Sequence, residues 1–272
     1  GVSVTDVDGN LSTVQLAVAN GTVTVTVAGA ATISAGANGT GTLTLSGSQA
    51  DLNATLASLV YQGNLNFNGS DTLTVTSTDS NAVTDVDTVA ITVTAQNDPP
   101  VNSVPGPQTV NEDTPLALSG VSVTDVDGNL STVQLAVGNG TVTVTLQGAA
   151  AISAGSNGST TRTPSGSQAD LNATLATLVY QGTLNYNGSD TLTVTSTDSN
   201  SVTDVDTVAI TVSPVNDPPV NQVPGPQATL ENVPVVFSPG NGNAVSISDV
   251  DAGGNPVQVT LTGSNGALTL SG

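Results

Sequence analysis

The sequence repeats itself at a fixed distance, and this feature limits its possible folds more than any other. The segment Gly1–Asn10 (GVSVTDVDGN) returns unchanged as Gly120–Asn129, a displacement of 119 residues. A third, diverged copy follows. Glu231 keeps the displacement of 119 from Glu112, whereas Asp249 lies 124 residues after Asp125, so five residues are inserted between them, within 234–243. A repeat of this length is a whole domain and is too long for one unit of a solenoid.

The repeats are out of phase with the ends of the sequence. The piece NEDTPLALS (Asn111–Ser119) precedes the second copy, and nothing equivalent precedes the first. We therefore expect three domains: residues 1–98 as a repeat lacking its first strand, residues 99–217 as a complete repeat, and residues 218–272 as the N-terminal part of a third. The sequence is expected to be a window from a longer tandem array.

The composition excludes several classes of chemistry. The chain has 21 acidic residues, one basic side chain (Arg162) and a net charge of −20, with no His, Cys, Met, Trp or Lys. Ser-His-Asp and Cys-His nucleophiles, P-loops and ordinary zinc sites all need residues that are missing. Phosphate backbones would repel this chain, so nucleic-acid binding is not expected. No apolar run reaches the length of a transmembrane helix, and none is expected.

The local patterns predict β-strands. Apolar residues alternate with Thr in Thr22–Val27, Thr72–Val75 and Thr88–Val93, which is the period of a strand with one buried face. Asn-Gly pairs between these runs suit turns that need positive φ. The stretch Gln49–Leu59 has helical spacing and could form one or two turns. Short strands and frequent turns predict an antiparallel sandwich, and the four prolines of Gln96–Pro107 predict a stiff linker.

The acidic residues gather at expected strand ends, where the chain offers almost no cations to neutralise them. Neighbouring carboxylates repel one another unless a cation or water intervenes. Ca²⁺ accepts six to eight oxygen ligands from Asp, Glu, Asn and carbonyl groups, so these clusters favour calcium over magnesium. Two other pairs are interpreted structurally: Asp51 and Asp170 as helix N-caps, and Asp71 and Asp190 as turn residues.

Three motifs, in order, resemble those of cadherin repeats. Thr124–Asn129 (TDVDGN) looks like the DxD-plus-Asn ligand motif. The pair Thr72–Ser80 and Thr88–Pro100 is similar to the last two cadherin strands with their linker. Gly47–Gly63 is more like the bacterial cadherin-like repeats of large surface adhesins. The resemblance covers essentially the whole chain and implies tandem Greek-key β-sandwiches of the cadherin or immunoglobulin type, joined by Pro-rich linkers.

The resemblance also implies which residues bind Ca²⁺. The first joint would use Asn97, Asp98, Asp125, Asp127, Asn129 and Asp198. The second would use Glu112, Asn216, Asp217, Asp249, Asp251 and Asn255. A half-site in the first repeat would hold Asp6, Asp8, Asn10 and Asp79. The family's DRE motif has no clear counterpart and the linker NDPP is shorter than DxNDN, so we expect about one or two ions per joint and an affinity on the order of 10⁻⁴–10⁻³ M.

Other interpretations stay open at this point. The DxD acids could be solvated turn residues, and the hairpin acids Asp85 and Asp87 are equally compatible with a polar tip. Paired carboxylates also occur in glycosidases, but sugar subsites usually use aromatic platforms and this chain has only three Tyr and two Phe.

The sequence thus predicts a non-enzymatic, calcium-rigidified segment of an extracellular adhesin or filament, acting as a rod-like spacer. It is expected at the cell surface or secreted, and its expected partners are copies of itself, head-to-tail or by strand donation. One alternative is an adhesin module that binds carbohydrate or a cell surface. A second is a non-catalytic spacer in a large secreted enzyme.

Overall fold

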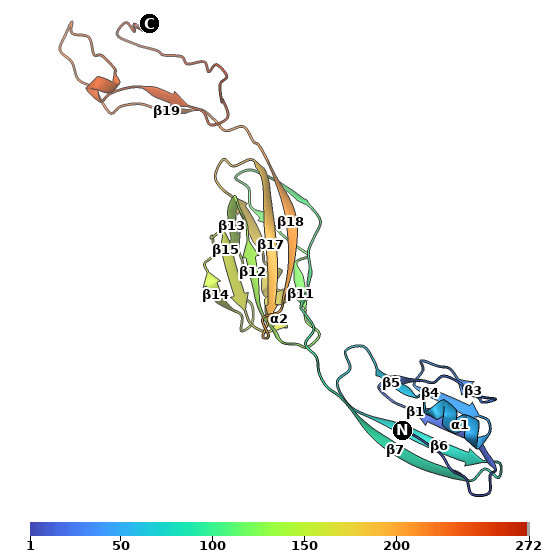
Figure 1. Ribbon diagram of the computed structural model, residues 1–272. Helices are drawn as coiled ribbons and strands as arrows, with labels where there is room; N and C mark the ends of the chain where they lie inside the picture. Colours follow the sequence, from blue (N-terminus) through green and yellow to red (C-terminus); the bar gives the residue numbers. More distant parts are fainter. Residues whose placement is uncertain (271–272) are drawn as a thin grey trace. The chain divides into compact units, whose positions relative to one another are not determined.

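The computed structural model describes residues 1–270 and divides into two compact units, Gly1–Asp98 and Pro99–Gly272 (Figure 1). The regular secondary structure of both units is mainly β-strand, with one short α-helix in each, α1 (Gln49–Leu56) and α2 (Gln168–Leu175). The predicted all-β class, built from antiparallel sheets, is confirmed. No helix of the described residues is long and apolar enough to cross a membrane.

The first unit has a five-stranded sheet in the order β3-β4-β1-β6-β7 and a two-stranded sheet, β2-β5. The strands of the larger sheet are β1 (Leu11–Ala17), β3 (Thr32–Gly36), β4 (Thr42–Ser46), β6 (Gly69–Asp79) and β7 (Thr84–Val93). The smaller sheet pairs β2 (Gly21–Thr24) with β5 (Val60–Gly63). All of these pairings are antiparallel.

The second unit repeats this arrangement and adds strands to both sheets. The larger sheet has the order β14-β15-β12-β17-β18-β9, and the smaller has the order β10-β16-β13. Its strands are β9 (Gln108–Asn111), β10 (Leu116–Ala117), β12 (Leu130–Ala136), β13 (Gly140–Thr143), β14 (Ala151–Gly155), β15 (Thr161–Ser165), β16 (Val179–Gly182), β17 (Gly188–Asp198) and β18 (Thr203–Ser213). A separate pair joins β8 (Val101–Ser103) to β11 (Ser122–Thr124).

One pairing differs from the antiparallel expectation, because β9 runs parallel to β18. β9 and β10 belong to one segment that leaves the edge of the larger sheet and continues on the edge of the smaller one. Asp113, with a φ of 61°, lies at the turn between the two strands. The segment therefore closes one side of the sandwich in the second unit.

The core forms where the alternating pattern places apolar side chains between the sheets. In β6, Leu73 and Val75 are buried, whereas the alternate residues Thr72 and Thr74 lie outside the core. The second unit has the larger core cluster, and it includes Leu192, Val194 and Tyr180, all with no exposed surface. The Thr residues of the outer face supply β propensity without adding charge.

The predicted helical stretch forms α1, but the capping prediction was wrong in detail. Ser48, not Asp51, is the N-cap, and its hydroxyl oxygen accepts a hydrogen bond from the Asp51 amide. The same hydroxyl donates to Asp51 Oδ2 at 2.8 Å. Ser167 and Asp170 repeat this geometry at α2, so the aspartates lie in the first helical turn, where negative charge is favourable.

The prediction that Asp71 and Asp190 lie in turns was also wrong. Both lie inside strands, β6 and β17, and are only 5% and 6% exposed. Asp190 accepts hydrogen bonds from the amides of Gly138 and Asn139 and from the Tyr180 hydroxyl, each at 2.9 Å. Asp190 therefore fixes the loop between β12 and β13 against the sheets.

The remaining residues, from Pro218 onward, contribute little buried surface. Only β19 (Val220–Gln222) and β20 (Ser246–Ser248) pair there, with a single 3₁₀ turn at Pro239–Asn241. Leu230 and Leu270 are 77% and 82% exposed, which indicates apolar positions that no core covers within residues 218–270.

Candidate metal centre

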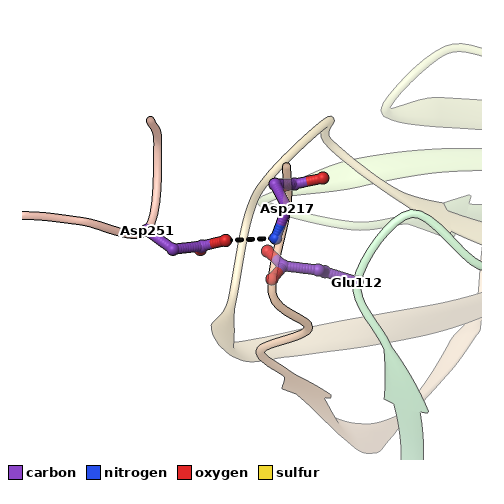
Figure 2. Close-up of side chains that lie close together, drawn as sticks. All are labelled: Glu112, Asp217 and Asp251. Atoms are coloured by element: carbon purple, nitrogen blue, oxygen red, sulfur yellow. Dashed lines mark hydrogen bonds between the residues drawn. The ribbon is translucent and has the colours of Figure 1, made fainter. Parts of the chain in front are cut away.

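Three carboxylates from distant parts of the sequence converge in the second unit. Glu112, Asp217 and Asp251 each offer one oxygen, and the three oxygens lie within 4.8 Å of one another (Figure 2). Glu112 is buried, Asp217 is half-buried and Asp251 is exposed. This graded burial leaves one side of the cluster open to solvent.

The parallel pairing of β9 with β18 places Glu112. Its amide donates to the Ser213 carbonyl at 2.9 Å, which extends the ladder one residue beyond β9. Its carboxylate accepts a hydrogen bond from the Val215 amide at 2.6 Å through Oε1 and one from Asn187 Nδ2 at 3.3 Å through Oε2. Glu112 is thus fixed by backbone and side-chain donors, while each oxygen keeps a further lone pair.

Asp217 lies in the Pro-rich linker, close to several other acidic side chains. Its backbone amide donates to Asp251 Oδ2, and Asn216 Nδ2 donates to its carbonyl at 3.0 Å. Its Oδ2 atom is buried and has no hydrogen-bond partner among the described residues. Burial, followed by the charges of Asp251, Asp113, Glu112 and Asp249, raises the pKa of the Asp217 carboxyl.

The turn that follows β20 places Asp251. Asp249 Oδ1 accepts hydrogen bonds from the amides of Asp251 and Ala252 at 3.0 and 3.1 Å. The Asn255 amide donates to the Ala252 carbonyl at 2.8 Å and continues the turn. Asp249 therefore shapes the loop that carries Asp251 towards Asp217.

The residues predicted for the first joint lie in two separately described units. Asn97 Nδ2 donates to the Asp98 carbonyl at 3.2 Å in the first unit. In the second unit, Asp125 Oδ1 accepts a hydrogen bond from the Asp127 amide at 3.0 Å. The Asn129 carbonyl accepts one from the Ser199 amide. Asp198 Oδ1 accepts hydrogen bonds from the amides of Asn200 and Val202. A calcium site at this joint stays a prediction.

The predicted half-site of the first repeat has the same local geometry. Asp6 Oδ1 accepts from the Asp8 amide at 2.9 Å, and Asp79 Oδ1 accepts from the amides of Asn81 and Val83 at 2.8 Å. The Asn10 carbonyl accepts from the Ser80 amide. Backbone amides therefore hold the equivalent carboxylates in the same orientation in both repeats.

Calcium fits the donor set of the second joint. The ligand atoms are carboxylate oxygens, and the Asp217 carboxylate has one buried oxygen, Oδ2, without a partner among the described residues. Burial first, and then the surrounding negative charges, raise the pKa of the Asp217 carboxyl. The only basic side chain, Arg162, lies in β15. A hard divalent cation with oxygen ligands would relieve this repulsion.

Sequence reasoning missed the structural carboxylates Asp71 and Asp190. The signal was available, because Asp71, Leu73 and Val75 share the inward phase of an alternating strand. Asp113 was also missed. It accepts a hydrogen bond from the Asn185 amide at 2.9 Å and is one of the charges that raise the pKa of Asp217.

Comparison with known proteins gives partial matches. The profile of the "Protein GAMETE EXPRESSED 2 domain" matches residues 2–88, less than half of the chain. No curated protein sequence matches. Among solved structures, extracellular domains 1–4 of protocadherin gamma B7 are 17% identical, with 94% of this chain covered, 57% of that chain covered and a TM-score of 0.36.

Two other solved structures are similar over much of the chain. Human CDH23 domains EC21–23 are 12% identical, with 89% and 69% of the two chains covered and a TM-score of 0.36. The fibronectin(III)-like modules of Clostridium thermocellum CbhA are 12% identical, with 78% and 83% covered and a TM-score of 0.26. The chain spans little more than half of the protocadherin fragment. At these TM-scores, the fold assignment rests on the strand pairing itself.

Proposed function

We propose that this chain is a calcium-binding structural segment of an extracellular adhesin or filament, in which calcium stiffens the joint between successive repeats. The observation that carries the proposal is the cluster of Glu112, Asp217 and Asp251, in which the Asp217 carboxylate has a buried oxygen without a partner among the described residues. These residues come from the sandwich, the linker and the following repeat. One ion bound to all three would restrict the linker.

The proposed role is mechanical and non-catalytic, and it places the protein outside the cell, at the surface or secreted. When bound, Ca²⁺ would supply positive charge and oxygen coordination. Glu112 would act as the fixed ligand, because backbone and side-chain donors already hold it. Asp217 and Asp251 would be the ligands whose positions depend on the ion. A bacterial origin is part of the same proposal and rests on the resemblance of Gly47–Gly63.

Isothermal titration calorimetry with CaCl₂ tests the site. We expect binding on the order of 10⁻⁴–10⁻³ M, weaker binding of Mg²⁺, and an affinity lowered about tenfold or more by Glu112→Gln or Asp217→Asn. Asp87→Asn is the matched control, because it removes the same charge from an exposed position on β7. Equal calcium affinity in all three variants would refute the assignment.

Small-angle scattering tests the mechanical part of the proposal. Chelation should raise the flexibility of the wild-type chain, and the response should be smaller in the Asp217→Asn variant, which loses the site at the second joint. If calcium binds at the cluster but scattering and melting temperature do not respond, the site would stand and the stiffening role would be wrong.

A further inference from the structure

Asn187 lies beside the candidate metal centre, and its chemical identity affects the charge there. Its Nδ2 atom donates a hydrogen bond to Glu112 Oε2 at 3.3 Å, and the side chain is exposed to solvent. As a carboxamide, Asn187 donates to Glu112 without adding charge. A carboxylate at the same position would repel Glu112, because two negative charges a few ångströms apart interact strongly where water is partly excluded.

The turn between β16 and β17 holds Asn187 next to Glu112. Asn185 has a φ of 57°, and its amide donates a hydrogen bond to Asp113 Oδ1 at 2.9 Å. This bond fixes the turn to the residue that directly follows Glu112. Asn187 comes two residues after Asn185, at the end of the turn. The backbone of the second repeat therefore supports the contact between the two side chains.

Gly188 follows Asn187 and is the first residue of β17. Its φ of 134° lies in a region that residues with a side chain rarely adopt, and an added Cβ would lie 3.2 Å from the Tyr186 hydroxyl oxygen. The position therefore requires glycine. Glycine leaves the backbone nitrogen unobstructed, and a residue at the end of a strand opens more easily than one in its middle. Both properties favour attack of this nitrogen on the preceding side chain.

The chemistry of an Asn-Gly pair needs only water. The Gly188 backbone nitrogen attacks Asn187 Cγ, the Cγ–Nδ2 bond breaks, and Nδ2 leaves as ammonia with the Gly188 amide proton, which gives a cyclic succinimide. Water then opens the ring. Addition at Cγ gives aspartate, and addition at the main-chain carbonyl of Asn187 gives isoaspartate. No oxidant or reductant takes part, and the product carries a carboxylate in place of the carboxamide.

Other Asn-Gly pairs of the protein are held more firmly. Asn38 Oδ1 accepts a hydrogen bond from the Val25 amide at 2.9 Å, and Asn38 Nδ2 donates to the Val25 carbonyl at 2.8 Å. Asn157 Oδ1 accepts one from the Val144 amide at 3.0 Å. Ring closure requires the carboxamide to turn towards the following nitrogen, so it would break these bonds. At Asn187 the bond to be broken is longer, 3.3 Å, and belongs to the nitrogen that leaves.

We propose that Asn187-Gly188 is a site of spontaneous deamidation, and that its aspartyl product adds a carboxylate beside Glu112 in the calcium centre. The hydrogen bond from Asn187 to Glu112 places the modified group, and Gly188 makes the reaction accessible. The modification converts a neutral donor to Glu112 into an additional negative charge. The age of the protein, without any second enzyme, therefore sets the charge of the centre.

Deamidation changes the centre in opposite ways without and with calcium. Glu112, Asp217 and Asp251 supply three carboxylates, and the modified Asn187 supplies a further one beside Glu112. Without metal, the added repulsion lowers the stability of the second repeat. With calcium, the higher charge of the surrounding oxygens raises the affinity. The joint then depends more on calcium as the protein ages. This consequence rests on the proposed function, whereas the modification itself does not.

Mass spectrometry of the aged chain tests the modification. The full chain is kept with a chelator at mildly alkaline pH, and its chymotryptic peptides are mapped, because Arg162 is the only site for trypsin. Asn68-Gly69 has the same local sequence, NGSD, and serves as the internal reference. We expect Asn187 to convert roughly tenfold faster than Asn157, a difference equivalent to one hydrogen bond. Conversion of Asn68 while Asn187 stays intact would overturn the proposal.

Calorimetry of substituted chains tests the effect on the centre. Asn187→Asp supplies the aspartyl product without ageing and should raise the calcium affinity of the centre by roughly fivefold. In the presence of a chelator, the same substitution should lower the Tm of the second repeat by about 2–4 °C. Asn157→Asp is the matched control, because it adds the same charge in the turn between β14 and β15. It should leave the calcium affinity unchanged.

A variant that cannot deamidate at the same rate separates this proposal from the proposed function. Asn187→Gln keeps a carboxamide but cyclises far more slowly, so its calcium affinity should stay constant during ageing while that of the wild-type chain rises. If no chain binds calcium, the proposed function is wrong, and conversion of Asn187 with a lower metal-free Tm of Asn187→Asp would still support the modification. If the wild-type chain binds calcium and Asn187→Asp binds it equally well, the role assigned to the product is overturned.

Discussion

Arg162 is the only basic side chain of the protein, and it lies in the core of the second repeat at 4% exposure. Its counterpart in the first repeat is Leu43, which has no exposed surface and belongs to the hydrophobic core. The Arg162 Nε atom has no hydrogen-bond partner among the described residues, and burial lowers the pKa of the guanidinium. We therefore expect Arg162→Leu to stabilise the second repeat.

The size of the effect follows from the buried donor. A buried polar group left without a partner costs about 1–3 kcal/mol, more when it is charged, and leucine restores the residue that the first repeat uses. For a domain of this size, each kcal/mol corresponds to about 4 °C in Tm, so the expected gain is about 4–12 °C. Differential scanning calorimetry of the full chain measures it, with Leu43→Arg as the converse variant that should destabilise the first repeat.

A lower Tm of the second repeat in the Arg162→Leu variant would contradict this prediction. That result would mean that the guanidinium makes favourable interactions that outweigh its desolvation. A change confined to the transition of the first repeat would equally contradict the assignment of Arg162 to the second core.

Three further predictions follow from the carboxylates and the helix cap. The raised pKa of the Asp217 carboxyl means that its ionised form is unfavourable in the metal-free folded state. The metal-free free energy of unfolding should therefore rise as pH falls through that pKa, whereas the calcium affinity should fall. Calorimetry across pH measures both quantities, and Asp217→Asn should make both less dependent on pH. Asp190→Ala leaves the Gly138 and Asn139 amides without their hydrogen-bond acceptor and should lower the unfolding free energy of the second repeat by about 3 kcal/mol in urea titrations. A loss under about 0.5 kcal/mol would contradict the stabilising role of these buried hydrogen bonds. Ser48→Ala removes the cap of α1 and should cost the first repeat about 1 kcal/mol by the same assay, with Ser48→Asp expected to retain most of it.

The strands and α1 were predictable because their signals are local. Alternation of Thr with Val or Leu fixes which face of a strand is buried, and the leucine spacing after Ser48 gives a helix. The burial of Arg162 could also have been read from the sequence, since the repeat aligns it with Leu43.

The long-range contacts were harder to predict from the sequence. Nothing local in β9 indicates that it pairs parallel to β18, about 100 residues later, because that pairing depends on how the segment crosses between the sheets. The approach of Glu112, Asp217 and Asp251 was expected only through the resemblance to cadherin repeats. The buried hydrogen bonds that Asp71 accepts from the Ala19 and Asn20 amides were missed, because buried aspartates are rare unless several donors surround them.

The parallel pairing of β9 with β18 has a mechanical consequence for the second repeat. β9 lies near the start of this repeat and β18 near its end, so tension applied at the two ends draws the paired strands past each other. The four paired positions, Gln108–Asn111, are then loaded in shear and must yield together. An antiparallel pair with the same connections could peel apart one bond at a time under a much smaller force.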